Sequence, residues 1–239
     1  MHAKWNEGPV GRALAAFRAD PTAAAGWGRL PFFAGGEADR VAASLDDLAG
    51  EASDLAPPPA DIFRAFALTP LDRVKAVILG QDPYPARGDA HGLAFSYVGR
   101  RRLPPSLKVI LAELAADLGG PVATSGDLTA WAREGVLLLN AALTTRTGTS
   151  GAHLRLGWSA LADQAVSAVS AQQPAVAFLL WGNAARSRAA LIDRTRHAVI
   201  ESGHPSPLNR ARDFPGTRPF SRANAHLAAH GIAPIDWQL

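Results

Sequence analysis

Four short apolar runs follow residue 60 and predict the strands of one sheet: VKAVIL at 74–79, GVLLLNAAL at 135–143, AVAFLLW at 175–181 and the weaker HAVIE at 197–201. Runs without alternating polar positions are typical of parallel strands that are covered on both faces. Segments with a helical pattern separate them, at 106–118, 158–172 and 184–194. The alternation predicts an α/β fold: a single domain with a central four-stranded parallel twisted sheet and helices on both faces.

The first 60 residues have a different pattern, rich in Ala and interrupted by Pro and Gly. This pattern predicts short helices at roughly 9–19 and 37–50, followed by a stiff stop at 56–60 (APPPA). Ser106 follows two prolines and is the predicted N-cap of the next long helix. We interpret residues 1–239 as one domain, in which a helical part, 1–60, packs on an α/β core, 61–239.

Composition narrows the class of protein. No stretch approaches the ~18 uninterrupted apolar residues that a membrane helix needs, so we expect no membrane contact. The first 17 residues lack an apolar signal core followed by a cleavage site, which favours a cytoplasmic protein. The chain has no Cys, and this excludes disulfide frameworks, thiolate nucleophiles, Cys-ligated zinc and iron–sulfur clusters.

The distribution of charge along the chain is compatible with a polyanionic binding partner but does not require one. The formal net charge is only +3, but from residue 181 onward eight arginines (186, 188, 194, 196, 210, 212, 218 and 222) face four acidic residues. Arginine forks match phosphate oxygens, which favours nucleic acid as a partner. A solvated surface in an Arg-rich chain explains the same excess equally well.

The residues just past each predicted strand are the candidates for chemistry, because ligands of parallel sheets bind beyond the carboxyl ends of the strands. After the first strand, Pro83 and Pro85 stiffen a loop that carries Asp82 and Tyr84, although Asp-Pro is also an ordinary turn pair. Asn140 follows three leucines inside an otherwise apolar run. A buried amide without partners would cost about 1–3 kcal/mol, so we expect it to face a pocket, although a capping or structural role is the alternative.

The fourth run leads into a second stiff loop, Ser202–Asn209, with two prolines around Ser206. It carries His204, and a single histidine of this kind is compatible with a structural role as well as a catalytic one. It also carries Leu208, which has no core to join on such a loop and which suits a wedge.

These segments resemble the family 1 uracil-DNA glycosylases. The matching stretches are GQDPY (80–84), AHGLAFS (90–96), PPSL (104–107), GVLLLN (135–140), LGW (156–158), FLLWG (178–182), HPSPL (204–208), FSRAN (220–224) and PIDW (234–237). They occur in the family's order from about residue 55 to the C-terminus, each at or near a predicted strand end. The resemblance implies an enzyme that flips uracil out of DNA and hydrolyses its N-glycosidic bond, the first step of base excision repair.

The resemblance assigns roles to single residues. It makes Asp82 the catalytic carboxylate that stabilises the sugar cation and orients water, and His204 the catalytic donor to uracil O2. It places Phe95 on the flipped base, Asn140 on the Watson–Crick edge and Tyr84 against C5, where a methyl group would clash. Backbone N–H groups around Gln81 complete the implied uracil site.

The resemblance also implies a DNA-binding surface, in which short hydroxyl and proline side chains approach phosphates and a leucine enters the duplex. The residues concerned are Ser96, Pro104, Pro105, Ser106, Ser206, Leu208, Arg210 and Arg212. The implied partner is single- or double-stranded uracil-containing DNA, bound by a monomer without cofactor or metal. The family's DNA-mimicking protein inhibitor is a further expected partner.

Two departures from the family pattern leave alternatives open. Pro85 stands where the family usually has a His that helps to hold the catalytic water, and residues 209–216 differ from the family's loop. One alternative is therefore a DNA-binding protein of the same fold with weak or lost catalysis; another is a glycosylase with altered base choice. A third feature, His226 and His230 at helical spacing, could share a metal.

Overall fold

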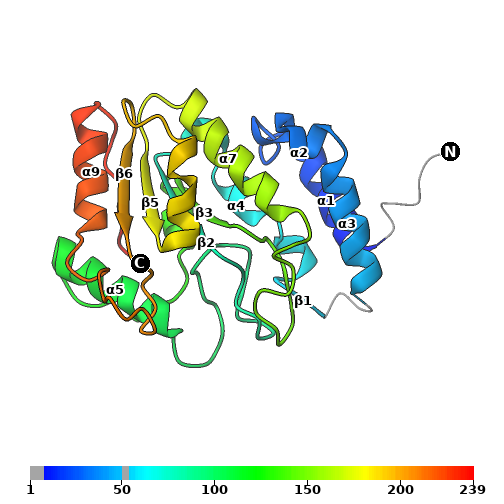
Figure 1. Ribbon diagram of the computed structural model, residues 1–239, viewed down its shortest axis with the longest axis horizontal. Helices are drawn as coiled ribbons and strands as arrows, with labels where there is room; N and C mark the ends of the chain where they lie inside the picture. The colour runs from blue at the N-terminus through cyan, green and yellow to red at the C-terminus, as the bar shows by residue number, and fades with distance from the viewer. Residues whose placement is uncertain (1–7, 50–53) are drawn as a thin grey trace.

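The structure is a computed structural model that describes residues 8–49 and 54–239 (Figure 1). The N-terminal residues 1–7, where the sequence predicts no signal segment, and residues 50–53, which include the predicted end of the second helix, lie outside the described residues. The helices are α1 (Pro9–Ala19), α2 (Pro31–Ala34), α3 (Glu37–Leu48), α4 (Arg64–Leu68), α5 (Pro105–Leu118), α6 (Thr129–Arg133), α7 (Trp158–Gln172), α8 (Asn183–Arg186) and α9 (Pro219–Ala229), with 3-10 turns η1 (Trp27–Arg29), η3 (Pro59–Asp61), η4 (Leu71–Arg73) and η5 (Ser187–Leu191). The strands are β1 (Leu55–Ala56), β2 (Ala76–Gly80), β3 (Val136–Asn140), β4 (Thr145–Arg146), β5 (Ala177–Trp181) and β6 (Ala198–Ser202).

The predicted parallel sheet is confirmed. Its four strands lie in the order β3-β2-β5-β6 and all run in the same direction. From β2 to β3 the chain moves across the sheet one way, and from β3 to β5 it moves back the other way. Right-handed crossovers therefore place α5 on one face of the sheet and α7 on the other. The register sets Gly80 beside Asn140 and Trp181 beside Ser202, so the last residues of neighbouring strands meet at one edge.

Two local predictions differ from the structure, and one small element was not predicted. Helix α5 begins at Pro105 with Pro104 as N-cap and no side-chain cap, so Ser106 is not the N-cap. Two prolines without N–H groups already fit the first positions of a helix, and no hydroxyl cap is needed there. The helix predicted at 184–194 is the short α8 followed by the 3-10 turn η5, and it ends at Leu191. The antiparallel pair β1–β4 was not predicted from the sequence.

The N-terminal helices pack against the sheet layer through aromatic contacts. Phe32 stacks on Trp158 of α7 with ring centroids 5.8 Å apart, and Gln164 Oε1 accepts the backbone N–H of Phe32 at 2.8 Å. Phe17 of α1 stacks on Phe63 at 5.0 Å. These contacts join the first helices and the α/β layers into one continuous hydrophobic core.

Helix α5 also anchors the segment that follows the HPSPL loop. The buried carboxylate of Glu113 accepts the backbone N–H groups of Gly216 and Arg218, at 2.7 and 2.8 Å. Asp117, one turn later, accepts the N–H groups of Phe220 and Ser221 at the start of α9, at 2.9 and 2.8 Å. Helix α5 therefore fixes the far end of the loop that carries Leu208.

Candidate active site

A cavity of about 520 Å³ opens at the carboxyl edge of the sheet, where the sequence analysis expected the chemistry. It gathers residues from β2, β3 and the loops after β2 and β6. The lining includes all six predicted catalytic and uracil-binding residues and three of the predicted DNA-binding ones: Gln81, Asp82, Tyr84, Phe95, Asn140 and His204, with Ser106, Ser206 and Leu208. The structure does not bring Ser96, Pro104, Pro105, Arg210 or Arg212 into the lining.

Asn140 presents an unpaired amide to this cavity. The residue is only 6% exposed, yet its side chain makes no hydrogen bond within the part of the chain that the structure describes. Gly80 lies beside it in the neighbouring strand, and a methyl group at residue 80 would come within 2.1 Å of Asn140 Oδ1. A buried amide without partners is unfavourable, so this position is explained by a ligand that offers one donor and one acceptor.

Phe95 forms an aromatic wall and adopts a left-handed backbone conformation, with φ +62°. Its ring lies 5.5 Å from the Trp181 ring and 5.9 Å from the His204 ring. The Tyr84 hydroxyl donates to the Phe95 carbonyl at 3.0 Å. Burial and the nearby Asp89 raise the pKa of the Tyr84 phenol, which therefore stays protonated and keeps this bond at neutral pH.

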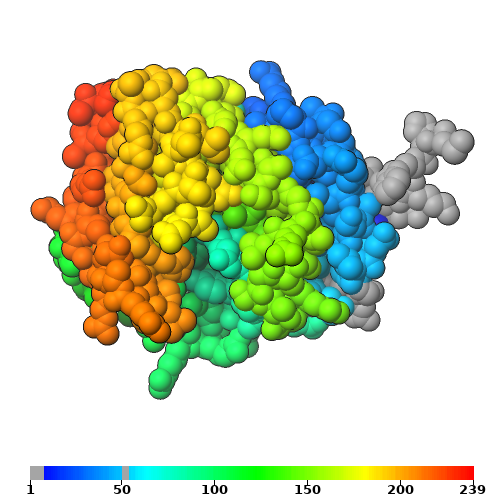
Figure 2. All heavy atoms as spheres, viewed as in Figure 1, coloured from blue at the N-terminus to red at the C-terminus, as the bar shows by residue number. Residues whose placement is uncertain are grey.

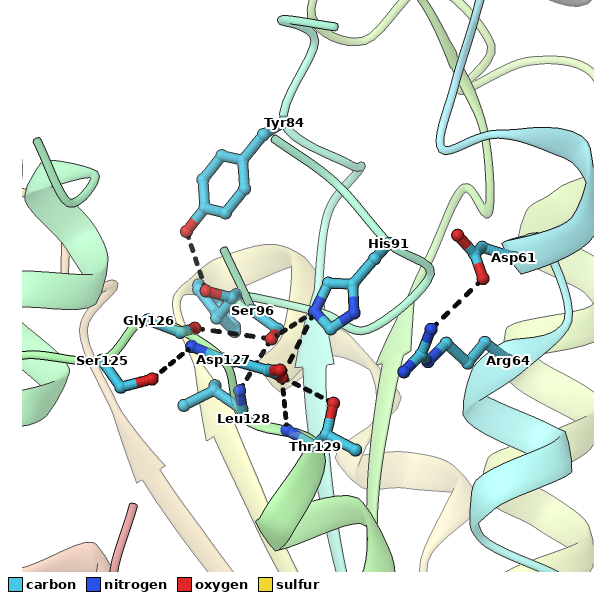
Figure 3. Close-up of polar contacts among 11 residues, drawn as sticks. Asp61, Arg64, Tyr84, His91, Ser96, Ser125, Gly126, Asp127, Leu128 and Thr129 are labelled. Carbon is cyan, nitrogen blue, oxygen red and sulfur yellow. Dashed lines mark hydrogen bonds and ion pairs between the residues drawn. The ribbon is translucent and has the colours of Figure 1, made fainter. Parts of the chain in front are cut away.

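Ser96 lies behind this wall, buried in a polar network (Figure 3). Its side chain is fully buried; its Oγ lies 2.6 Å from His91 Nε2 and accepts the Leu128 N–H at 2.8 Å. Asp127 approaches the same His91 nitrogen at 3.8 Å, so the three residues do not form a Ser-His-Asp relay. Burial lowers the pKa of His91. In this structure Ser96 supports the backbone next to Phe95, and its hydroxyl does not reach a surface where a phosphate could contact it.

His204 is held in one tautomer. Its Nδ1 accepts the backbone N–H of Ser206 at 3.0 Å, which puts the proton of the neutral ring on Nε2. Burial lowers the pKa of His204, so the ring is neutral at pH 7. The Nε2–H has no acceptor among the described residues and is available to a ligand in the cavity.

Asp82 is the carboxylate of the cavity and is held from two sides. Its Oδ1 accepts the Gln81 side-chain amide at 3.1 Å. Its Oδ2 accepts the Ser150 hydroxyl at 2.8 Å and the Gly151 N–H at 2.6 Å. Ser150 was not among the residues predicted from the sequence, and no local pattern around 145–152 indicated it.

Leu208 projects from the cavity rim with 89% of its surface exposed. The loop that carries it is braced by Asn209, whose side-chain amide donates to the His204 carbonyl at 3.1 Å and to Asp213 Oδ1 at 2.8 Å. Residues 209–216, where the sequence departs from the family pattern, therefore hold this loop with contacts of their own. Arg210 and Arg212 are exposed beside it.

Most of the C-terminal arginines are engaged inside the protein. Of the eight, five pair with acidic residues and a sixth donates to a backbone carbonyl; these six are Arg186, Arg188, Arg194, Arg196, Arg218 and Arg222. Their number in the sequence therefore overstates the charge available to a partner. A cluster nearer the cavity was not predicted: Arg100, Arg101 and Arg102 are exposed. Among the described residues, only Arg101 of the three has a side-chain partner, Asp89 at 3.0 Å. The three consecutive arginines in the sequence were the signal from which this cluster could have been predicted.

A metal centre has no support in the described residues, which contain no group of three or more His, Asp or Glu side chains suited to an ion. His226 Nε2 accepts the Ala198 N–H at 3.3 Å, and His230 Nδ1 lies 2.9 Å from the His226 carbonyl. These contacts give both histidines structural roles. Within the described ranges no helix is long and apolar enough to cross a bilayer.

Comparison with known proteins places this geometry in a family. The profile of the uracil DNA glycosylase superfamily matches residues 66–228. The chain is 50% identical over 181 residues to the uracil-DNA glycosylase of Phocaeicola vulgatus (76% of this chain, 82% of the relative). It is 53% identical over 184 residues to that of Deinococcus deserti (77% and 74%).

Among solved structures, mimivirus uracil-DNA glycosylase superposes with a TM-score of 0.76 at 26% identity, covering 83% of this chain and 80% of the other. A variant of mimivirus UNG solved in complex with UGI superposes with a TM-score of 0.80 at 26% identity, covering 87% and 86%.

Proposed function

The chain belongs to the uracil DNA glycosylase superfamily, and we propose that it excises uracil from DNA with Asp82, Asn140 and His204 in the central roles. The observation that carries these roles is the buried amide of Asn140, unpaired among the described residues, in the same cavity as His204, whose Nε2–H has no acceptor among those residues. An enzyme that acts on a base must take it out of the stack into such an enclosed site.

The cavity walls suit uracil in particular. Phe95 offers a ring for stacking, and Tyr84 occupies the side where the C5 methyl of thymine would lie. The Asn140 carbonyl accepts from uracil N3–H, while its NH₂ group donates to O4. Cytosine presents the opposite polarity at both atoms, which would leave two buried polar clashes.

The reaction needs charge stabilisation on both sides of the glycosidic bond. As the C1′–N1 bond breaks, its electron pair leaves with uracil, and the neutral His204 donates Nε2–H to O2 of the anion. The Asp82 carboxylate stabilises the developing sugar cation, orients the water that adds to C1′ and accepts the proton that this water loses. Preorganised charges of this kind supply a large share of catalysis in enclosed sites.

One assay tests the function directly: a uracil-containing oligonucleotide is incubated with the protein, and abasic sites are then revealed by alkaline strand scission. We expect scission at uracil and at no other base. A folded protein that binds this DNA without forming abasic sites would instead support the DNA-binding alternative.

The DNA surface surrounds the cavity mouth. Pro104 is the N-cap of α5 and Pro105 its first residue. The next N–H groups, from Ser106 and Leu107, have no backbone acceptor in the described chain, as suits a phosphate. Ser206, from the loop after β6, also lines the cavity. In Figure 2 the segment near residue 100 projects at the lower edge, between the orange loop after β6 and the lime segment near residue 150. We assign this edge to DNA.

Leu208→Ala should slow excision from duplex DNA more than from single strands, because only a duplex has a stack to fill after the base has left. The expected difference is about 1–3 kcal/mol in the excision barrier, comparable to the unstacking that the leucine offsets. Single-turnover rates on matched single- and double-stranded uracil substrates measure it. An equal loss on both would show that Leu208 shapes the cavity and is not a wedge.

Arg100→Ala combined with Arg102→Ala should weaken binding to DNA of every sequence. Arg101 and Arg102 line a groove that shares Tyr84 and Pro85 with the cavity, and Arg100 precedes them in the chain. Loss of two phosphate contacts should reduce the slope of log Kd against log salt by about 1.4 for single strands. The double variant Arg29→Ala and Arg133→Ala is the control. It also removes two positive charges, but from residues that line neither the cavity nor the groove. An unchanged salt slope would show that this loop does not contact DNA.

The structure of a mimivirus UNG variant in complex with UGI supports the further proposal that this chain binds a protein inhibitor of that kind. The monomeric state, the cytoplasmic location and the absence of a cofactor remain predictions from the sequence.

A further inference from the structure

The catalytic carboxylate receives no backbone donor from the residues that follow it. Asp82 is followed by Pro83, and Pro85 comes two residues later; neither has an N–H group. The N–H of Tyr84 makes no hydrogen bond to Asp82. Among the described residues, both donors to Oδ2 come instead from a segment 68 and 69 residues further along the chain, Ser150 and Gly151.

The segment that presents these donors is a braced turn. It begins in β4, which pairs with β1, and the Thr145 hydroxyl donates to the Thr149 carbonyl at 2.6 Å. The Gly148 N–H donates to the Pro85 carbonyl at 2.9 Å, which ties the turn to the Asp82 loop itself. Gly151 has φ +72°, a conformation that favours glycine and that directs its N–H toward Asp82. Ser150 is thus held at a fixed distance from the carboxylate.

We propose that Ser150 is a positioning residue for uracil excision, whose hydroxyl, together with the Gly151 N–H, fixes the rotation of the Asp82 carboxylate. Two donors on Oδ2 orient the group, so that Oδ1, which has only the weaker Gln81 contact, is the oxygen that faces the sugar and the attacking water. Hydrogen bonds to a charged group are among the stronger ones in proteins, and misplacement of a catalytic group by a fraction of an ångström is costly. The inference rests on the proposed function, because it acts through Asp82.

Ser150→Ala removes the hydroxyl and keeps the Gly151 N–H. We expect the single-turnover excision rate on uracil DNA to fall about tenfold, with Kd for the same DNA unchanged. Ser150→Thr keeps a hydroxyl and should restore most of the rate. Thr149→Ala is the matched control: it is the adjacent exposed residue of the same turn, and its hydroxyl has no partner among the described residues.

A double-mutant cycle distinguishes positioning from a general effect on the fold. In an Asp82→Asn background, Ser150→Ala should change the residual rate by less than about twofold, because the group that it orients has lost its charge. The same tenfold loss in that background would overturn the proposal. So would a raised Kd with an unchanged rate, which would make Ser150 a DNA contact, or a faster Ala variant, which would mean that the hydroxyl masks Asp82. A wild type that excises no uracil in this assay would refute the proposed function instead.

Discussion

Asp82→Asn should slow uracil excision by about 2–4 kcal/mol of barrier, which is a factor between about 30 and 1,000 in rate. The variant keeps the shape of the side chain, and its carbonyl can still accept from Ser150 and Gly151, as Oδ2 does now. It lacks the negative charge that offsets the sugar cation. Single-turnover rates on single-stranded uracil DNA measure the loss without a contribution from base-pair opening.

Asp47→Asn is a suitable control, because Asp47 is exposed on α3, outside the cavity lining, and should leave the rate unchanged. Circular dichroism establishes that both variants are folded, and DNA binding by the Asp82 variant should persist. If the Asp82 variant keeps the wild-type rate, the carboxylate is not part of the chemistry, and the mechanism above is wrong.

Asn140→Asp should exchange the base that the cavity accepts. A site built to hydrogen-bond one partner rejects a mismatched one by about 10⁴-fold or more, and wild-type Asn140 matches uracil. A protonated carboxyl offers a donor to cytosine N3 and an acceptor for its amino group, the reverse of the amide. Burial disfavours the ionised carboxyl, so cytosine excision by the variant should increase as the pH falls. Rates on uracil and cytosine substrates across pH test both statements.

Two companion variants make this prediction specific. Asn140→Ala should lose uracil excision and gain nothing on cytosine. Gly80→Ala should do the same, because its methyl group occupies the space of Asn140 Oδ1 and displaces the amide. A folded Asn140→Asp protein that ignores cytosine and retains full activity on uracil would show that Asn140 does not read the base.

The amino-acid sequence was sufficient to predict what depends on neighbouring residues. Unbroken apolar runs predict buried parallel strands, because such a strand has apolar side chains on both faces and neither face can lie against water. Once the strands are parallel and adjacent, their last residues must meet at one edge, and this is why Asp82, Asn140 and His204 were predicted near the same site. Prolines around Asp82 and Ser206 stiffen their loops whatever the rest of the chain does.

Only the tertiary structure determines which side chains form hydrogen bonds or ion pairs with each other. Ser96 and Ser150 show this. Ser96 is buried against His91, whereas Ser150 donates a hydrogen bond to Asp82. Six C-terminal arginines are engaged within the fold, whereas the RRR loop leaves two free of partners in the described chain. A hydrogen bond requires two atoms within about 3 Å. For segments 68 residues apart, as Asp82 and Ser150 are, only the packing of the whole chain brings them to that distance.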